Sequence, residues 1–136
     1  MSDAAKILIA DDEQECIDFV REALAETPHE VISAMDGEEA LELAKAQNPQ
    51  LIILDIQMPK RNGFEVFAAL RADENLASVP VIMLTAVSER TGIKFSGEDM
   101  GEYMGSEPEA YVDKPIEPVV LRQTITRLLK DSGAGA

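Results

Sequence analysis

The sequence has one cysteine, no long apolar run and few basic residues, and each shortage excludes a class of protein. A single cysteine, Cys16, rules out an internal disulfide bond and fits a reducing compartment such as the cytoplasm. No apolar run approaches the roughly 20 residues of a membrane-spanning helix. The first apolar segment is too short for a signal peptide, and Asp11 and Asp12 interrupt it. We therefore expect a cytoplasmic protein without membrane insertion.

The charge balance is strongly acidic. The chain has 12 Lys and Arg residues against 26 Asp and Glu residues, which gives a net charge of −14. Direct nucleic-acid binding needs basic patches, so this balance argues against it. A cationic protein partner is permitted by the charge but is not implied by it.

The length and composition indicate one globular domain. A domain of about this size buries roughly 70% of the surface of its unfolded chain, which is enough for one core. The hydrophobic content of 46% suits such a domain, and no repeat or linker divides the 136 residues. We expect a single domain over residues 1–136, with its core at about 5–131 and a frayed tail at 132–136.

Short apolar runs alternate with amphipathic stretches, which predicts strands alternating with helices. The predicted strands are 6–11, 31–35, 50–54, 79–84 and about 110–112. The predicted helices are 13–26, a helix capped by Asp36 and Glu39 and ending near 48–49, a helix at about 63–72, and a last one from Pro118. The pattern predicts an α/β fold with a doubly wound, five-stranded parallel sheet.

The helix predicted at 13–26 has its apolar residues at positions that predict a buried face. They are Ile17, Phe19, Val20, Ala23 and Leu24. Cys16 falls on the same side, so we expect it to be buried by packing rather than to be reactive.

Asp55 is the most informative residue in the chain. It follows the apolar run 51–54, whose lack of polar alternation predicts a strand buried on both faces of a parallel sheet. Pro59 and Gly63 then turn the chain out of the sheet. The sequence therefore places a carboxylate at the carboxyl end of a central strand, where open α/β sheets bind their ligands.

Other polar residues follow apolar strands in the same way. They are Asp11, Asp12, Thr85 and Lys114. Parallel strands deliver these residues to one edge of the sheet, where the three carboxylates would repel one another unless a hard cation such as Mg²⁺ joined them. An ammonium and a hydroxyl suit phosphate oxygens, and an aspartyl carboxylate can accept a phosphoryl group covalently. The set suggests phosphoryl chemistry.

At these positions the chain resembles the receiver domain of two-component response regulators, over about residues 5–131. The matching stretches are Ile9-Ala10-Asp11-Asp12, Leu54-Asp55-Ile56-Gln57-Met58-Pro59 with Asn62-Gly63, Leu84-Thr85-Ala86, and Tyr111-Val112-Asp113-Lys114-Pro115. Each stretch alone is weak, but the four in order, each at the end of a predicted strand, are highly specific. The resemblance implies a flavodoxin-like receiver fold.

The resemblance also implies what the acids do. Asp55 is implied to accept a phosphoryl group from a sensor histidine kinase or a histidine phosphotransfer protein. Asp12, Asp55 and the backbone carbonyl of Gln57 are the implied Mg²⁺ ligands, and Asp11 is implied to hold metal-bound water. Such a protein is a phosphoacceptor that assists its own phosphorylation and dephosphorylation, and is not an enzyme in the ordinary sense.

Three further residues have implied roles. Lys114 binds the phosphoryl oxygens, while Thr85 and Tyr111 form a switch pair in which the hydroxyl moves to the phosphate and the ring packs inward. This switch would alter the binding of a downstream protein target. No output domain follows about residue 131, so we expect a stand-alone receiver.

The stretch 88–108 departs from the family pattern because it is longer and rich in glycine. Four of the eight glycines lie there, at 92, 97, 101 and 105. Each interior glycine costs a helix about 1 kcal/mol relative to alanine, which predicts an atypical, glycine-rich fourth helix region. It is either an adaptable signalling element or a surface insertion of no functional weight.

Other interpretations compete with the receiver. Asp12 with Glu15 could form a capping box that merely starts a helix. A phosphatase with an aspartyl nucleophile needs a second acid two residues later, where this chain has Gln57. A nucleotide-binding domain needs a glycine-rich loop after the first strand, and none is present. A degenerate receiver acting as a phosphorylation-independent docking module is the remaining alternative.

Overall fold

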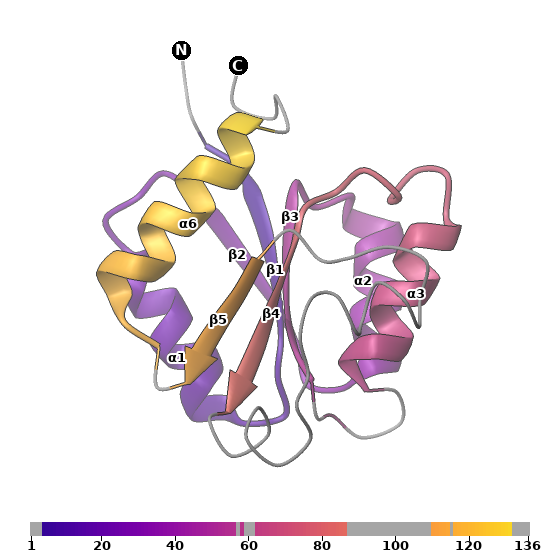
Figure 1. The fold of residues 1–136 in the computed structure, drawn as a ribbon, viewed down its shortest axis with the longest axis horizontal. Helices are drawn as coiled ribbons and strands as arrows, with labels where there is room; N and C mark the ends of the chain where they lie inside the picture. Colours follow the sequence, from indigo (N-terminus) through magenta and orange to yellow (C-terminus); the bar gives the residue numbers. More distant parts are fainter. Residues whose placement is uncertain (1–3, 57, 59–61, 87–109, 115, 132–136) are drawn as a thin grey trace.

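The computed structural model describes residues 4–56, 58, 62–86, 110–114 and 116–131. These residues form a five-stranded parallel sheet with the strand order β2-β1-β3-β4-β5 (Figure 1). The strands are β1 (Lys6–Ala10), β2 (Glu30–Ala34), β3 (Leu51–Asp55), β4 (Val81–Ala86) and β5 (Ala110–Lys114). The helices are α1 (Gln14–Ala23), α2 (Gly37–Gln47), α3 (Gly63–Ala72) and α6 (Pro118–Asp131). The predicted doubly wound α/β fold is confirmed.

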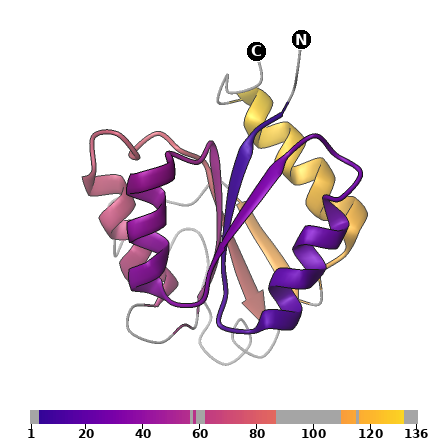
Figure 2. The same ribbon diagram turned by 180° about the vertical axis from the view of Figure 1, so that it is seen from behind.

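The sheet is the middle of three layers. Helices α1 and α6 cover one face and α2 and α3 cover the other, as the two opposite views show (Figures 1 and 2). Strand β1 illustrates how one strand serves both layers, because successive side chains of a strand point to opposite faces. Ile7 and Ile9 belong to the core cluster with α1 and α6, whereas Leu8 and Ala10 belong to the cluster with α2 and α3.

Strand β3 is buried on both faces, as the apolar run predicts. Residues Leu51 to Leu54 are all 0% exposed. Strand β1 pairs with β3 on one side, and β4 pairs with it on the other. The strand is therefore covered along its length, and it ends at Asp55.

Helix α1 is shorter than predicted and one of its apolar residues faces solvent. Ile17, Val20 and Ala23 are buried, but Phe19 is 37% exposed. Phe19 comes two residues after Ile17, which rotates it about 200° around the helix and away from the core. Cys16 packs against the cluster beneath α1 and α6 as predicted, although it is half-buried rather than buried.

The start of α2 carries the predicted capping pair. The side chain of Asp36 accepts a hydrogen bond from the backbone N–H of Glu39 at 2.8 Å. The Glu39 carboxylate in turn accepts from the N–H of Met35 at 2.7 Å, one residue before the expected donor. Helix α2 ends at Asn48, whose positive φ of 49° suits the left-handed conformation that asparagine tolerates.

Helix α3 has a complete capping box, which the sequence reading did not assign. The Asn62 side chain accepts from the N–H of Glu65 at 2.9 Å, and Glu65 accepts from the N–H of Asn62 at 3.0 Å. In α1, by contrast, the N-cap is Glu13 and no side-chain bond caps the helix. The capping box of Asp12 with Glu15, considered as an alternative role for Asp12, does not form.

Strands β4 and β5 extend further toward their carboxyl ends than predicted. Thr85 pairs with Asp113 and Ala86 with Lys114, so Thr85 and Lys114 lie within the strands rather than after them. The extension arises because each strand supplies the hydrogen-bonding partners of the other. The glycine-rich region 88–108 and the tail 132–136 lie outside the described residues.

Candidate functional site

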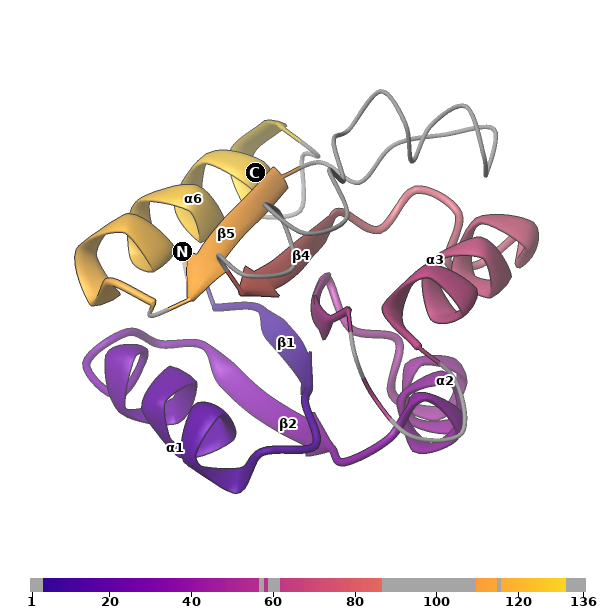
Figure 3. The ribbon, with the colours of Figure 1, turned by 60° about the horizontal axis from the view of Figure 1, so that its bottom comes forward.

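The candidate site lies at the carboxyl ends of β1 and β3, which are neighbours in the sheet (Figure 3). From β1 the chain passes to the outer strand β2, and it then returns across β1 to form β3 on the other side. The winding direction of the sheet therefore reverses between β1 and β3. Open α/β sheets bind ligands at such a reversal, because the connections diverge there and leave the strand ends uncovered.

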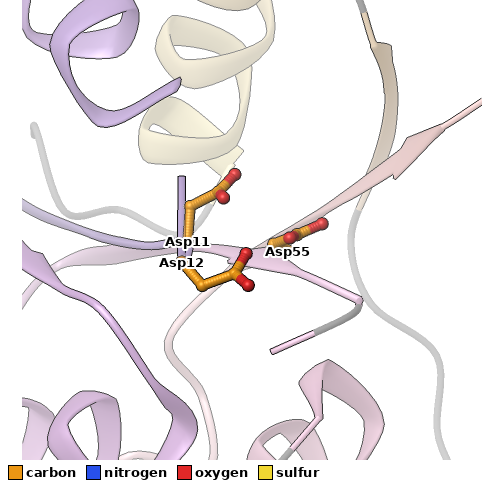
Figure 4. A group of neighbouring side chains, drawn as sticks. All are labelled: Asp11, Asp12 and Asp55. Atoms are coloured by element: carbon orange, nitrogen blue, oxygen red, sulfur yellow. The ribbon is translucent and has the colours of Figure 1, made fainter. Parts of the chain in front are cut away.

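Three acids meet at this reversal (Figure 4). Asp11 and Asp12 follow β1, and Asp55 is the last residue of β3. One carboxylate oxygen from each residue lies within 4.8 Å of the other two. Asp11 is 0% exposed and Asp55 is 5% exposed, while Asp12 is exposed. The predicted convergence of the three carboxylates is confirmed.

Backbone and side-chain bonds hold Asp11 in place. Its N–H donates to the carbonyl of Ala34 at 3.1 Å and so extends the pairing of β1 with β2. Its Oδ1 accepts from the N–H of Glu13 at 2.9 Å, which bends the chain toward α1. Sequence reasoning missed this Asx turn, although an aspartate two residues before a helix cap is a recognised signal for one.

The donor set fits a hard divalent cation. Mg²⁺ binds oxygen ligands octahedrally at about 2.0–2.1 Å, so two opposite ligands lie about 4.2 Å apart. Three carboxylate oxygens within 4.8 Å of one another are therefore close to the spacing of ligands around one such cation. A cation between them would also offset their mutual repulsion, which is strong because two of the three groups are buried. Gln57, the fourth residue in the implied ligand set, lies outside the described residues.

The backbone of β4 and β5 carries Thr85 and Lys114 to the same edge of the sheet. Leu84 pairs with Asp55, and Thr85 follows it directly in β4. Lys114 ends β5, opposite Ala86. The side chains of Thr85 and Lys114 lie outside the described part of the structure, so their binding of phosphoryl oxygens stays a prediction.

Tyr111 lies farther back in β5, opposite Met83. It is half-buried and packs against the core cluster beneath α2 and α3. An ordinary core ring and the inward position of a switch residue both produce this packing. The role of Tyr111 in switching is therefore still a prediction.

Fold and site together define a single-sheet α/β domain with three acids where the winding direction of the sheet reverses. The chain belongs to the response regulator receiver domain family. The model of that family matches residues 7–126. The four sequence stretches that carried the resemblance all fall within these limits. The suspected family is thus confirmed.

The chain is similar to receivers in proteins of different kinds. It is 34% identical to the alkaline phosphatase synthesis transcriptional regulatory protein PhoP of Bacillus subtilis, covering 96% of this chain and 51% of that protein. It is 33% identical to the polar-differentiation response regulator DivK of Brucella ovis, covering 93% of this chain and 97% of that one. The chain spans about half the length of the first curated relatives that it matches.

The same fold occurs in solved structures. The chemotaxis response regulator CheY4 of Vibrio cholerae matches with a TM-score of 0.79 and 31% sequence identity. The match covers 93% of this chain and 99% of that one. The likeness therefore includes both layers of helices and the whole sheet, and not only the strands around the acids.

Proposed function

We propose that the protein is a phosphoacceptor response regulator in which Asp55 receives the phosphoryl group. Membership of the receiver family supports this proposal. The observation that carries it is the position of Asp55, buried at the end of β3 with the oxygens of Asp11 and Asp12 within 4.8 Å. The donor would be the phosphohistidine of a sensor histidine kinase or of a histidine phosphotransfer protein.

The transfer moves one phosphoryl group from nitrogen to oxygen. A carboxylate oxygen of Asp55 attacks phosphorus, the phosphorus–nitrogen bond breaks, and the imidazole keeps the bonding electron pair and takes up a proton. The product is an acyl phosphate on Asp55. The protein contributes the position of the carboxylate and is itself modified, so it assists its own phosphorylation and dephosphorylation without being an enzyme in the ordinary sense.

Mg²⁺ is the proposed cofactor. Held by Asp12, Asp55 and the backbone carbonyl of Gln57, with Asp11 binding metal-bound water, it would neutralise charge on the phosphoryl oxygens. Lys114 and Thr85 are proposed to bind the remaining oxygens. These residues would let a phosphoryl donor approach three acids that otherwise repel it.

Phosphorylation is proposed to change a surface that binds a downstream protein, through the switch pair Thr85 and Tyr111. The net charge of −14 favours protein over nucleic acid as that direct partner. Within the described residues, no helix has the length and apolar character needed to cross a bilayer. We propose the cytoplasm as the place of action, which the reduced single cysteine also suits.

The test is phosphorylation by a small donor. Wild-type protein incubated with acetyl phosphate and Mg²⁺ should gain the mass of one phosphoryl group, because Asp55 is the acid with a metal site beside it. Asp55→Asn should gain none, since an amide is a poor nucleophile for phosphorus. Asp18→Asn, which changes an exposed acid of α1, is the matched control and should gain the group like wild type.

Two outcomes would contradict the proposal in different ways. An undiminished adduct in Asp55→Asn would refute the assignment of the acceptor. A folded wild type that never gains the group, with Mg²⁺ present, would instead favour the phosphorylation-independent docking module.

A further inference from the structure

We infer that Gly63 is a positioning residue that sets the location of the Asp55 carboxylate. Gly63 is the first residue of α3, and the sequence analysis placed it in a turn and in a stretch that matches the family, without a role toward Asp55. In the structure it lies against the peptide group of Asp55 itself. The inference rests on the proposed function, because it concerns how Asp55 is held for phosphoryl transfer.

The approach of Gly63 leaves no space for a side chain. A Cβ atom at this position would lie 2.5 Å from the carbonyl oxygen of Asp55, 3.2 Å from its carbonyl carbon and 3.0 Å from the Cα of Ile56. All three neighbours are backbone atoms, so no side-chain rotation can relieve the contact. Either the end of β3 or the start of α3 would have to move.

The start of α3 is held firmly in this place. The N–H of Gly63 donates to the carbonyl of Ile56 at 2.8 Å, which ties the start of α3 to the residue after Asp55. The capping box of Asn62 and Glu65 fixes the first turn. The buried face of the helix anchors the rest in the core cluster beneath α2 and α3, through Val66, Phe67 and Leu70.

The end of β3 forms the other side of this contact. Asp55 is the last residue of the strand, and the next N–H, that of Ile56, donates to Leu84 at 3.4 Å, a long hydrogen bond. A new methyl group at Gly63 would press directly on the Asp55 peptide, and we expect relief of this contact to displace Asp55. The carboxylate would then move relative to those of Asp11 and Asp12.

A displacement of this size matters for phosphoryl transfer. Relief of a 2.5 Å contact to an ordinary distance needs a movement of about 0.9 Å or more. Reacting atoms must approach in a defined geometry, and a misplacement of about 1 Å can slow a reaction roughly 100-fold. Gly63 thus keeps the Asp55 carboxylate at the right distance from those of Asp11 and Asp12.

The experiment compares Gly63→Ala with Val66→Ala. Both change the first turns of α3, but Val66, 1% exposed, belongs to the core cluster beneath α2 and α3, and its truncation removes atoms instead of adding one against Asp55. At saturating Mg²⁺ with acetyl phosphate, we expect Gly63→Ala to be phosphorylated at least about tenfold more slowly per folded molecule. It should also bind Mg²⁺ more weakly in a direct titration. Val66→Ala should lose stability in urea yet react within about twofold of wild type.

The outcomes separate this inference from the proposed function. A wild-type rate of phosphorylation in folded Gly63→Ala would overturn the positioning role of Gly63. The acceptor role of Asp55 would still stand in that case, provided that Asp55→Asn gains no phosphoryl group. An equal slowing in Val66→Ala would also overturn the positioning role, because general loosening of α3 would then explain the effect.

A second variant serves if Gly63→Ala shows no cooperative unfolding transition. Asn62→Ala removes the capping box and loosens the start of α3 without adding atoms near Asp55. We then expect a slowing of roughly threefold, larger than in Val66→Ala. A rate equal to that of wild type would overturn the inference.

Discussion

The two ends of the parallel sheet have opposite chemistry. At the amino end, neutral side chains satisfy the backbone: the N–H of Ala5 donates to Nδ1 of His29 at 3.1 Å, and that of Lys6 donates to Oε1 of Gln50 at 3.0 Å. At the carboxyl end, two buried aspartates and an exposed one bring their oxygens within 4.8 Å. One end is held together by its own hydrogen bonds, whereas the other gathers like charges.

This difference separates stability from function along the strands. Hydrogen bonds at the amino end stabilise the fold without a ligand, because both partners belong to the chain. Clustered carboxylates repel one another unless a cation joins them, so with the proposed Mg²⁺ the carboxyl end would gain stability from a ligand instead. Binding of a cation at the carboxyl end of the sheet would thus leave the hydrogen bonds at the amino end unchanged.

The largest expected effect is at the carboxyl end, on removal of Asp12. Mg²⁺ at about 100 times its dissociation constant should stabilise the wild type by about 2.7 kcal/mol. Asp12→Ala should lose most of this response, and without metal it should be as stable as wild type or more so, because repulsion is relieved. Urea unfolding with and without Mg²⁺ measures both quantities.

The control for Asp12 is Glu15→Ala, which removes an exposed acid from the first turn of α1 outside the three-acid group. It should keep the full Mg²⁺ response. If Asp12→Ala also kept the full Mg²⁺-dependent gain in stability, the metal would not bind where the three acids meet. The two ends of the sheet would then not differ in their dependence on Mg²⁺.

A smaller effect is expected at the amino end, on truncation of His29. His29→Ala leaves the N–H of Ala5, a residue that is 5% exposed, without its imidazole acceptor. We expect a loss of about 1–2 kcal/mol in the free energy of unfolding, equal with and without Mg²⁺. His29→Asn supplies an amide oxygen near the place of Nδ1 and should recover part of the loss. A Mg²⁺-dependent loss in His29→Ala would show that the two ends are coupled.

The smallest effect is expected where the amino end meets solvent. Gln47 accepts a hydrogen bond from the Lys6 ammonium at 3.0 Å, and the bond is exposed. Water replaces such a partner readily, so Gln47→Ala should change the free energy of unfolding by less than about 0.5 kcal/mol. If Gln47→Ala lost as much free energy of unfolding as His29→Ala, burial would not explain which hydrogen bonds at the amino end matter most for stability.

Most of the fold could be predicted from local patterns. The bounds of α3 and the start of α6 at Pro118 agree with the prediction, because capping residues and helical spacing act over a few neighbouring residues. Phe19 was predicted wrongly because a list of apolar residues does not by itself distinguish the two sides of a helix. The strand ends at Thr85 and Lys114 were placed too early, since pairing with a distant strand extends a ladder beyond its apolar run.

The sequence alone determined that the strands alternate with helices and that acids stand at or next to the carboxyl ends of β1 and β3. A period of two or 3.6 residues and a turn signal are local properties, so they can be read without the fold. Only the tertiary structure decided that Asp11 and Asp55 come within reach of one cation, and that Gly63 packs against the Asp55 peptide. Such distances depend on how strands and helices pack across the whole sheet, where a shift of one ångström changes the chemistry but leaves the sequence pattern unchanged.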